Sequence, residues 1–164
     1  MQALKRGAMF FMAGLALVGV AQSALAGGPY QYFAVTPCRV ADTRSAAFNS
    51  GAFLDGTPSL QGTVTRALFV KGMCGVPATA TAVSLNATVV NPTSQGWLAL
   101  WPANTTWPGI STLNFTAGAG ATANGAVVPL SPCASPCGDL NVMYGVTPST
   151  NSTDLIIDVT GYFQ

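Results

Sequence analysis

The stretch 153–163, TDLIIDVTGYF, decides the fold class because apolar and polar side chains alternate along most of it. Successive side chains of an extended strand point to opposite faces, so alternate residues lie together. One face of this stretch is apolar and carries Leu155, Ile157, Val159 and Phe163. The other face carries Asp154, Ile156, Asp158, Thr160 and Tyr162. The pattern predicts a β-strand that buries one face, as strands of antiparallel sheets do.

Short runs rich in β-branched and aromatic residues recur along the chain, separated by Gly, Pro, Asn, Ser and Thr. We expect further strands at 30–35, 66–72, 81–90, 96–102, 110–116, 122–130 and 139–145. Within 81–90 the apolar set is Val83, Leu85, Ala87 and Val89. The Gly-rich segment 45–64 reads as a long surface loop. These patterns predict an all-β chain, with a single antiparallel β-sandwich or jelly-roll domain over 27–164.

Residues 1–26 have the composition of a secretory signal peptide. Lys5 and Arg6 precede the apolar run GAMFFMAGLALVGVA, and the small residues of Ala24-Leu25-Ala26 form a cleavage site. The apolar run is too short to favour a membrane-spanning helix, although an uncleaved anchor is the alternative. We therefore expect export from a bacterial cell, to the medium or the cell surface, with no membrane insertion after cleavage.

Charge is scarce in the part of the chain that follows the signal peptide. Residues 27–164 contain four basic and five acidic residues, which give a net charge of −1. A nucleic-acid-binding protein needs a basic face, so nucleic acid is not an expected partner. The chain contains no histidine and no glutamate, which removes Ser-His-Asp and Cys-His catalysis and histidine-based zinc sites. The aspartates do not form a calcium-loop motif. We expect no enzymatic activity, no cofactor and no bound metal.

The four cysteines, Cys38, Cys74, Cys133 and Cys137, all follow the signal peptide. An even number of cysteines in an exported chain favours two disulfides, for which three pairings are possible. The four-residue spacing of Cys133 and Cys137 lies in a turn-rich segment where a local bond closes easily. We therefore favour 133–137 with 38–74, with a four-cysteine metal site as the competing interpretation.

Several motifs together resemble a family of bacterial secreted β-domains. The first is F-x-x-x-P-C-R-x-x-D-T-R at 33–44, and the others lie at 74–102, 111–115, 124–130 and 152–163. Domains of that family often occur as repeats on exported proteins or beside peptidase domains. The resemblance implies an accessory surface module with no established chemistry of its own. A single copy directly after a signal peptide is unlike that pattern, and assembly into something larger is the simplest function for it.

The motif at 33–44 is also the densest charge cluster after the signal peptide. If 39–44 is extended, Asp42 and Arg44 share one face and Arg39 points to the other. Arginine suits bidentate pairing with a carboxylate, so we expect Arg39 or Arg44 to brace the first strand against Asp154 or Asp158 of the last. A clamp for an acidic ligand such as a sulfated glycan is the alternative.

Asp154 and Asp158 are poor candidates for glycosidase chemistry. Four residues of strand separate their Cα atoms by about 13 Å, whereas the two carboxyl groups of a glycosidase lie about 5 to 9.5 Å apart. Pairing with an aspartate from elsewhere in the fold, such as Asp42, remains open from the sequence.

Three tryptophans form the remaining candidate site. Alternation within 96–102 places Leu98 and Leu100 in the core, and therefore Trp97 and Trp101 on the outer face. Trp107 follows in a loop. Exposed aromatic side chains commonly mark interaction surfaces. A neighbouring subunit, a covering loop of the same chain, and a glycan are all possible occupants.

A chain with this few charges is better suited to burial in an assembly than to life as a soluble monomer. The sequence favours a secreted, non-enzymatic structural protein that self-assembles into a filament or surface layer. Addition of a strand to a sheet edge, with 27–35 or the last strand as the exchanged segment, is the expected mode. The alternative function is a surface adhesin or carbohydrate-binding module that uses Trp97, Trp101 and Trp107.

Overall fold

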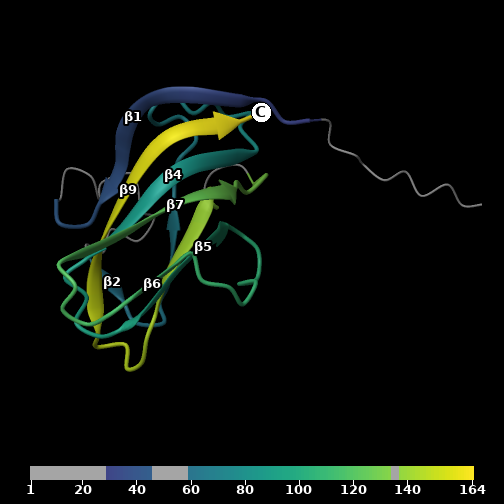
Figure 1. The fold of residues 1–164 in the computed structure, drawn as a ribbon. Coiled ribbons are helices and arrows are strands. Elements are labelled where there is room, and N and C mark those ends of the chain that lie inside the picture. Colours follow the sequence, from purple (N-terminus) through teal and green to yellow (C-terminus); the bar gives the residue numbers. More distant parts are fainter. Residues whose placement is uncertain (1–28, 46–58, 134–136) are drawn as a thin grey trace, which may run out of the picture.

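A computed structural model describes residues 29–45, 59–133 and 137–164 of the chain. These residues contain nine strands and no helix, which confirms the all-β prediction (Figure 1). The strands are β1 (Tyr32–Asp42), β2 (Leu60–Gln61), β3 (Thr65–Leu68), β4 (Ala82–Val90), β5 (Gly96–Pro102), β6 (Leu113–Phe115), β7 (Ala121–Pro129), β8 (Leu140–Gly145) and β9 (Ser152–Phe163). Within the described ranges there is no helix long and apolar enough to cross a membrane.

The strands form two antiparallel sheets. Sheet A has the order β1-β9-β4-β7, and β2 pairs with β9 beyond the end of β1. Sheet B has the order β3-β8-β5-β6. Figure 1 shows β1, β9 and β4 running side by side, with β9 between the other two. β9, the strand whose alternation predicts the fold class, is therefore an interior strand of sheet A.

Both sheets contribute to one cluster of buried apolar side chains. β4 supplies the four residues that its alternation predicts, Val83, Leu85, Ala87 and Val89. The facing residues of sheet B include Leu98, Leu140, Val142 and Tyr144, all essentially inaccessible to solvent. Two sheets that share one core are what a β-sandwich requires.

The alternation of β9 changes at a bulge. Val159 pairs with Leu85 of β4, but the next pair joins Gly161 to Ser84, so Thr160 is an extra residue. An extra residue moves every later side chain to the other face. Tyr162 consequently packs against the core, and the assignment of Phe163 to the core face is wrong.

Two expected segment boundaries also differ from the structure. The first strand extends to Asp42, seven residues beyond the end expected at 35. The segment 45–64 is not loop throughout, because Leu60 is fully buried and pairs with Thr153 of β9. Pairing with an existing strand supplies hydrogen bonds that local composition does not reveal. The signal peptide at 1–26 and the part of the expected loop at 46–58 lie outside the described residues.

Candidate functional site

The charge cluster of the 33–44 motif spans β1 and β9. Arg39 of β1 makes a bidentate contact with Asp158 of β9, with Nε–Oδ1 and Nη2–Oδ2 distances of 2.8 and 3.2 Å. Its Nη1 also donates to Oδ2 of Asp42 at 3.1 Å. Arg39 therefore joins the first strand of the fold to the last, which is the brace that the sequence analysis describes.

A second bulge places Arg39 and Asp42 on the same face. Arg39 pairs with Asp158, and the next pair joins Ala41 to Ile157, so Val40 is the extra residue. The expectation that Arg39 and Asp42 point to opposite faces is therefore wrong. It assumes regular alternation, and the bulge replaces that alternation at the point where the two charged groups must meet.

Arg44 does not reach β9. Its Nε and Nη2 atoms donate to the two oxygens of Asp42, at 2.8 and 2.7 Å. Asp154 instead accepts hydrogen bonds from the hydroxyls of Thr43 and Ser59, at 3.0 and 2.9 Å. Arg39 thus braces the two strands through an ion pair, and Thr43 ties them through Asp154.

Asp42 is the centre of this cluster, with a side chain only 6% exposed between two guanidinium groups. Hydrogen bonds from Arg44 lower the pKa of Asp42 to about 2, against the opposing effect of burial. The hydrogen bond to Asp158 raises the pKa of Arg39. Both groups stay ionised across the physiological range, and both Asp42 oxygens accept hydrogen bonds from arginine. This arrangement suits a structural clasp better than proton transfer.

Because of Asp42, the free energy of unfolding should depend on pH in the acid range. Its pKa is lower in the folded state, so the stabilisation is present above pH 4 and is lost as the pH falls towards 2. The free energy of unfolding of the wild type should fall, relative to that of Asp42→Asn, by about 2 kcal/mol over this window. Urea titrations of both proteins at several pH values measure the difference. An Asp42→Asn deficit that is the same at pH 2 and pH 6 would contradict it.

The tryptophans do not form a common exposed face. Trp101 is only 4% exposed, and its indole N–H donates to the carbonyl oxygen of Thr105 at 3.1 Å. The loop that follows β5 therefore covers Trp101, which corrects its place in the expected interaction surface. Outward direction on a strand does not ensure exposure when a connecting segment folds back over it.

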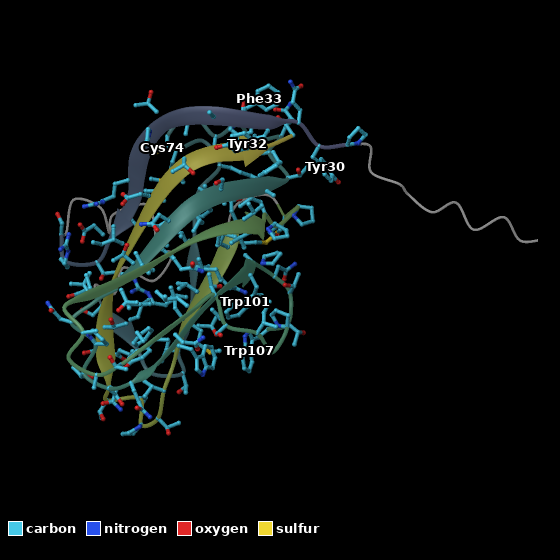
Figure 2. The ribbon with its side chains drawn as sticks, in the orientation of Figure 1. Tyr30, Tyr32, Phe33, Cys74, Trp101 and Trp107 are labelled. Atoms are coloured by element: carbon cyan, nitrogen blue, oxygen red, sulfur yellow. A yellow bond between two sulfur atoms is a disulfide. The ribbon has the colours of Figure 1, made fainter. Side chains whose placement is uncertain are left out.

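Trp97 and Trp107 stack on each other, with ring centroids 4.9 Å apart and planes 8° from parallel. Trp97 lies flat against Gly145 of the neighbouring β8, where a Cβ atom would be within 2.2 Å of the indole ring. The two rings border an apolar groove of about 490 Å³ beside Thr147. Trp107 is the more accessible of the two, at 39% exposure. It is labelled with Trp101 in Figure 2.

The cysteines form the two favoured disulfides, Cys38–Cys74 and Cys133–Cys137. Within the described residues no group of three or more potential ligands is placed to hold a metal ion. Cys38–Cys74 ties β1 to the segment that follows β3, and Figure 2 shows Cys74 beside β1. The disulfide therefore links an edge strand of sheet A to the segment that connects β3 to β4.

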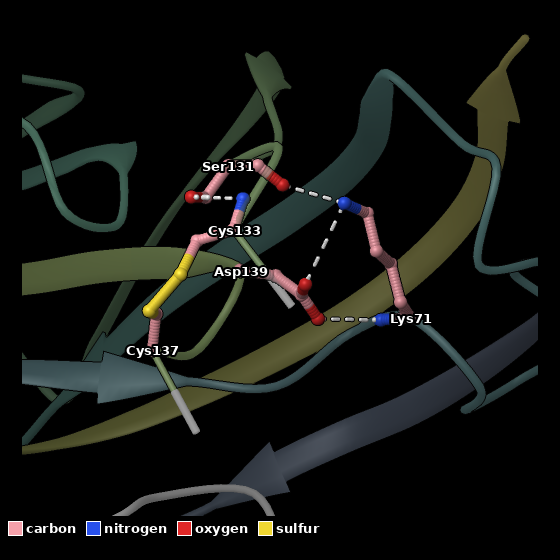
Figure 3. The surroundings of a disulfide bond; sticks show 5 residues. All are labelled: Lys71, Ser131, Cys133, Cys137 and Asp139. Atoms are coloured by element: carbon pink, nitrogen blue, oxygen red, sulfur yellow. Dashed lines mark hydrogen bonds and ion pairs between the residues drawn. A yellow bond between two sulfur atoms is a disulfide. The ribbon is translucent and has the colours of Figure 1, made fainter. Parts of the chain in front are cut away.

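A polar cluster that no pattern in the sequence indicates lies near the second disulfide (Figure 3). Oδ2 of the buried Asp139 accepts hydrogen bonds from the backbone N–H groups of Val70 and Lys71, both at 2.7 Å. Nζ of Lys71 lies 3.8 Å from Oδ1 of Asp139 and donates to the carbonyl oxygen of Ser131 at 2.5 Å. The Ser131 hydroxyl accepts from the N–H of Cys133 and not from the lysine. The cluster thus joins chain segments and presents no serine–lysine pair.

No protein-family model matches the chain, and a comparison with curated proteins finds no match.

Proposed function

We propose that the protein is a secreted, non-enzymatic structural subunit that self-assembles outside the cell by β-strand addition, into a filament or a surface layer. The observation that carries this proposal is β7, a nine-residue edge strand of sheet A without a charged residue. Unprotected edges of this kind pair readily with other chains. A low overall charge also removes the repulsion that keeps monomers apart.

Two disulfides support an extracellular location, because such bonds persist in oxidising compartments. The leader-like composition of 1–26 and the resemblance of the 33–44 motif to secreted β-domains support the same location.

The charge cluster supports a non-enzymatic role. Three of its charged groups, Arg39, Asp42 and Asp158, are engaged with one another. Asp42 and Asp158 are thus each held by an arginine.

The adhesin alternative has weaker support. With Trp101 covered, the groove beside Trp97 and Trp107 is the remaining aromatic site for a sugar. Sugar sites combine a stacking ring with converging hydrogen-bond donors and acceptors. Among the residues lining this groove only Thr63 and Thr147 carry a hydroxyl, and the Thr63 hydroxyl already donates to Gly62. The indole N–H of Trp107 donates to the carbonyl oxygen of Ile110.

Negative-stain microscopy of the protein purified from an oxidising compartment tests the proposal directly. The expected result is regular polymers or sheets that dissociate on dilution, with a matching concentration dependence in analytical ultracentrifugation. A monodisperse monomer at the highest attainable concentration would refute the proposal.

A further inference from the structure

The two edges of sheet A differ in how they are protected. β1 carries a bulge at Val40 and the ion pairs of Arg39, which are devices that prevent edge strands from pairing with other chains. β7 pairs with β4 over all nine residues without a register shift, and it has no charged residue. No other strand in the described ranges pairs with β7. The open edge of β7 therefore has neither the bulge nor the charges found on β1.

An apolar groove of about 440 Å³ lies beside the open edge of β7. It separates β7 from β5 and from the segment 108–112 of the facing layer, and no charged residue lines it. Ile110 and Val127 border the groove and are 63% and 60% exposed, the two most exposed large apolar side chains of the described residues. We call this surface the β7 groove.

A second apolar surface lies at the start of β1, on the opposite edge of sheet A. Tyr30, Tyr32 and Phe33 are all exposed, and Figure 2 shows them together, apart from Trp101 and Trp107. The stretch 29–36 has no charge, because the charged residues of β1 begin at Arg39. We call this surface the N-terminal aromatic patch. It matches the β7 groove in lacking charge and in exposing apolar side chains.

Strand direction makes the two edges compatible. Each strand of the path β1-β9-β4-β7 is antiparallel to its neighbour, so β1 and β7 run in opposite directions. A second copy placed beside β7 in the same orientation therefore presents its β1 antiparallel to that β7. The alternation of strand directions continues across the contact without any rotation of the copy.

We propose that the open edge of β7 in one copy pairs with residues 30–34 of the next copy, at the start of β1 and before its register shift between Ala34 and Cys38, so that sheet A continues from subunit to subunit. This inference rests on the proposed self-assembly and names its contact. The two surfaces differ, so the contact is head-to-tail and leaves a free edge at each end of the chain of subunits. With four strands per copy, the subunits repeat about every 19 Å along the sheet.

The side chains of the two edges fit this contact. Phe33 lies opposite Tyr162, which faces the core, and Tyr32 lies opposite Phe163 on the outer face. In the next copy Phe33 therefore faces the β7 groove, and Tyr32 lies on the same face as Val127. β1 keeps its pairing with its own β9, so no strand has to leave its subunit.

Two lysine substitutions test the contact from its two sides. Val127→Lys places a charge on the outer face of β7, where Tyr32 of the next copy would lie, and Tyr30→Lys places one in the N-terminal aromatic patch. Each variant alone should assemble about a hundredfold less well than wild type, because an unpaired ammonium group would be buried. Mixed in equal amounts, the two should form a 1:1 dimer, since each retains one intact surface and the intact surfaces complement each other. Phe33→Lys repeats the test within β1.

Val64→Lys is the control, because Val64 is an exposed valine that belongs to neither surface and its substitution should leave assembly unchanged. Analytical ultracentrifugation measures the assembly state of every protein and mixture, and thermal unfolding checks that each variant is folded. Wild-type protein that stays monomeric would overturn the proposed function itself. Wild-type polymers with unaffected Val127→Lys assembly would overturn only the β7 contact. Loss of assembly in Val127→Lys with full assembly of Tyr30→Lys and Phe33→Lys would show β7 pairing with itself and overturn the head-to-tail arrangement.

Discussion

Replacing Cys38 and Cys74 together with alanine is expected to lower the free energy of unfolding by about 4 kcal/mol, since the bond closes a long loop. The two cysteines are 36 residues apart, and a cross-link of that span removes much of the conformational freedom of the unfolded chain. The bond also joins β1 to the segment between β3 and β4, so its loss frees an edge strand of sheet A from that segment. Urea unfolding without reductant measures the change.

Cys133→Ala with Cys137→Ala is the matched control, because it removes the other disulfide. Those cysteines are four residues apart, and closing so short a loop stabilises the fold by only about 2 kcal/mol. Equal losses in the two double variants would contradict the loop-length explanation. Arg39→Ala should then be more harmful in the background without Cys38–Cys74, since both contacts hold β1 in place.

Regular alternation is the part of this fold that the sequence predicts well. β4 buries every second residue as expected, because it lies between two strands and pairs with β7 without a shift. The spacing of the cysteines likewise favours the pairing that the structure contains. The alternation of β4 and the Cys133–Cys137 pair both depend on local pattern alone.

The errors arise where a partner strand or a distant segment decides the outcome. The bulges at Val40 and Thr160 add one residue relative to the neighbouring strand, and neither residue is marked by its own type. Trp101 has the alternation of an exposed residue, but the segment that covers it approaches from beyond β5. The Asp139 cluster is also invisible in sequence, because its main partners are backbone N–H groups.

The bulge at Val40 also relates the ion pairs of Arg39 to the proposed assembly. Val40 lets Arg39 reach both Asp42 and Asp158, which fixes the charged half of β1 to β9. The edge of sheet A is thereby blocked from Arg39 onward and stays uncharged from Pro29 to Thr36. A head-to-tail contact is thus restricted to the start of β1, and its register is limited accordingly.

Asp139→Ala is expected to lower the free energy of unfolding by about 4 kcal/mol, because two buried N–H groups lose a charged acceptor worth about 2 kcal/mol each. The N–H groups belong to Val70 and Lys71, directly after β3. The backbone of Asp139 also bonds to Leu68, Ala103 and Ser131, so the residue holds together the ends of β3, β5 and β7. Urea unfolding measures the loss, and amide exchange at positions 70 and 71 should accelerate before global unfolding.

Lys71→Met separates the backbone contacts of Asp139 from its ion pair. This variant keeps the apolar stem and the N–H of residue 71 but removes the ammonium group that contacts Ser131. It should cost about 1 kcal/mol, since a 3.8 Å ion pair and one hydrogen bond are lost while Asp139 keeps both N–H donors. If Lys71→Met were as destabilising as Asp139→Ala, the ion pair and not the two N–H groups would be the reason that Asp139 is buried. Unchanged exchange at positions 70 and 71 in Lys71→Met, beside rapid exchange in Asp139→Ala, is the result that assigns the stabilisation to the carboxylate as a backbone acceptor.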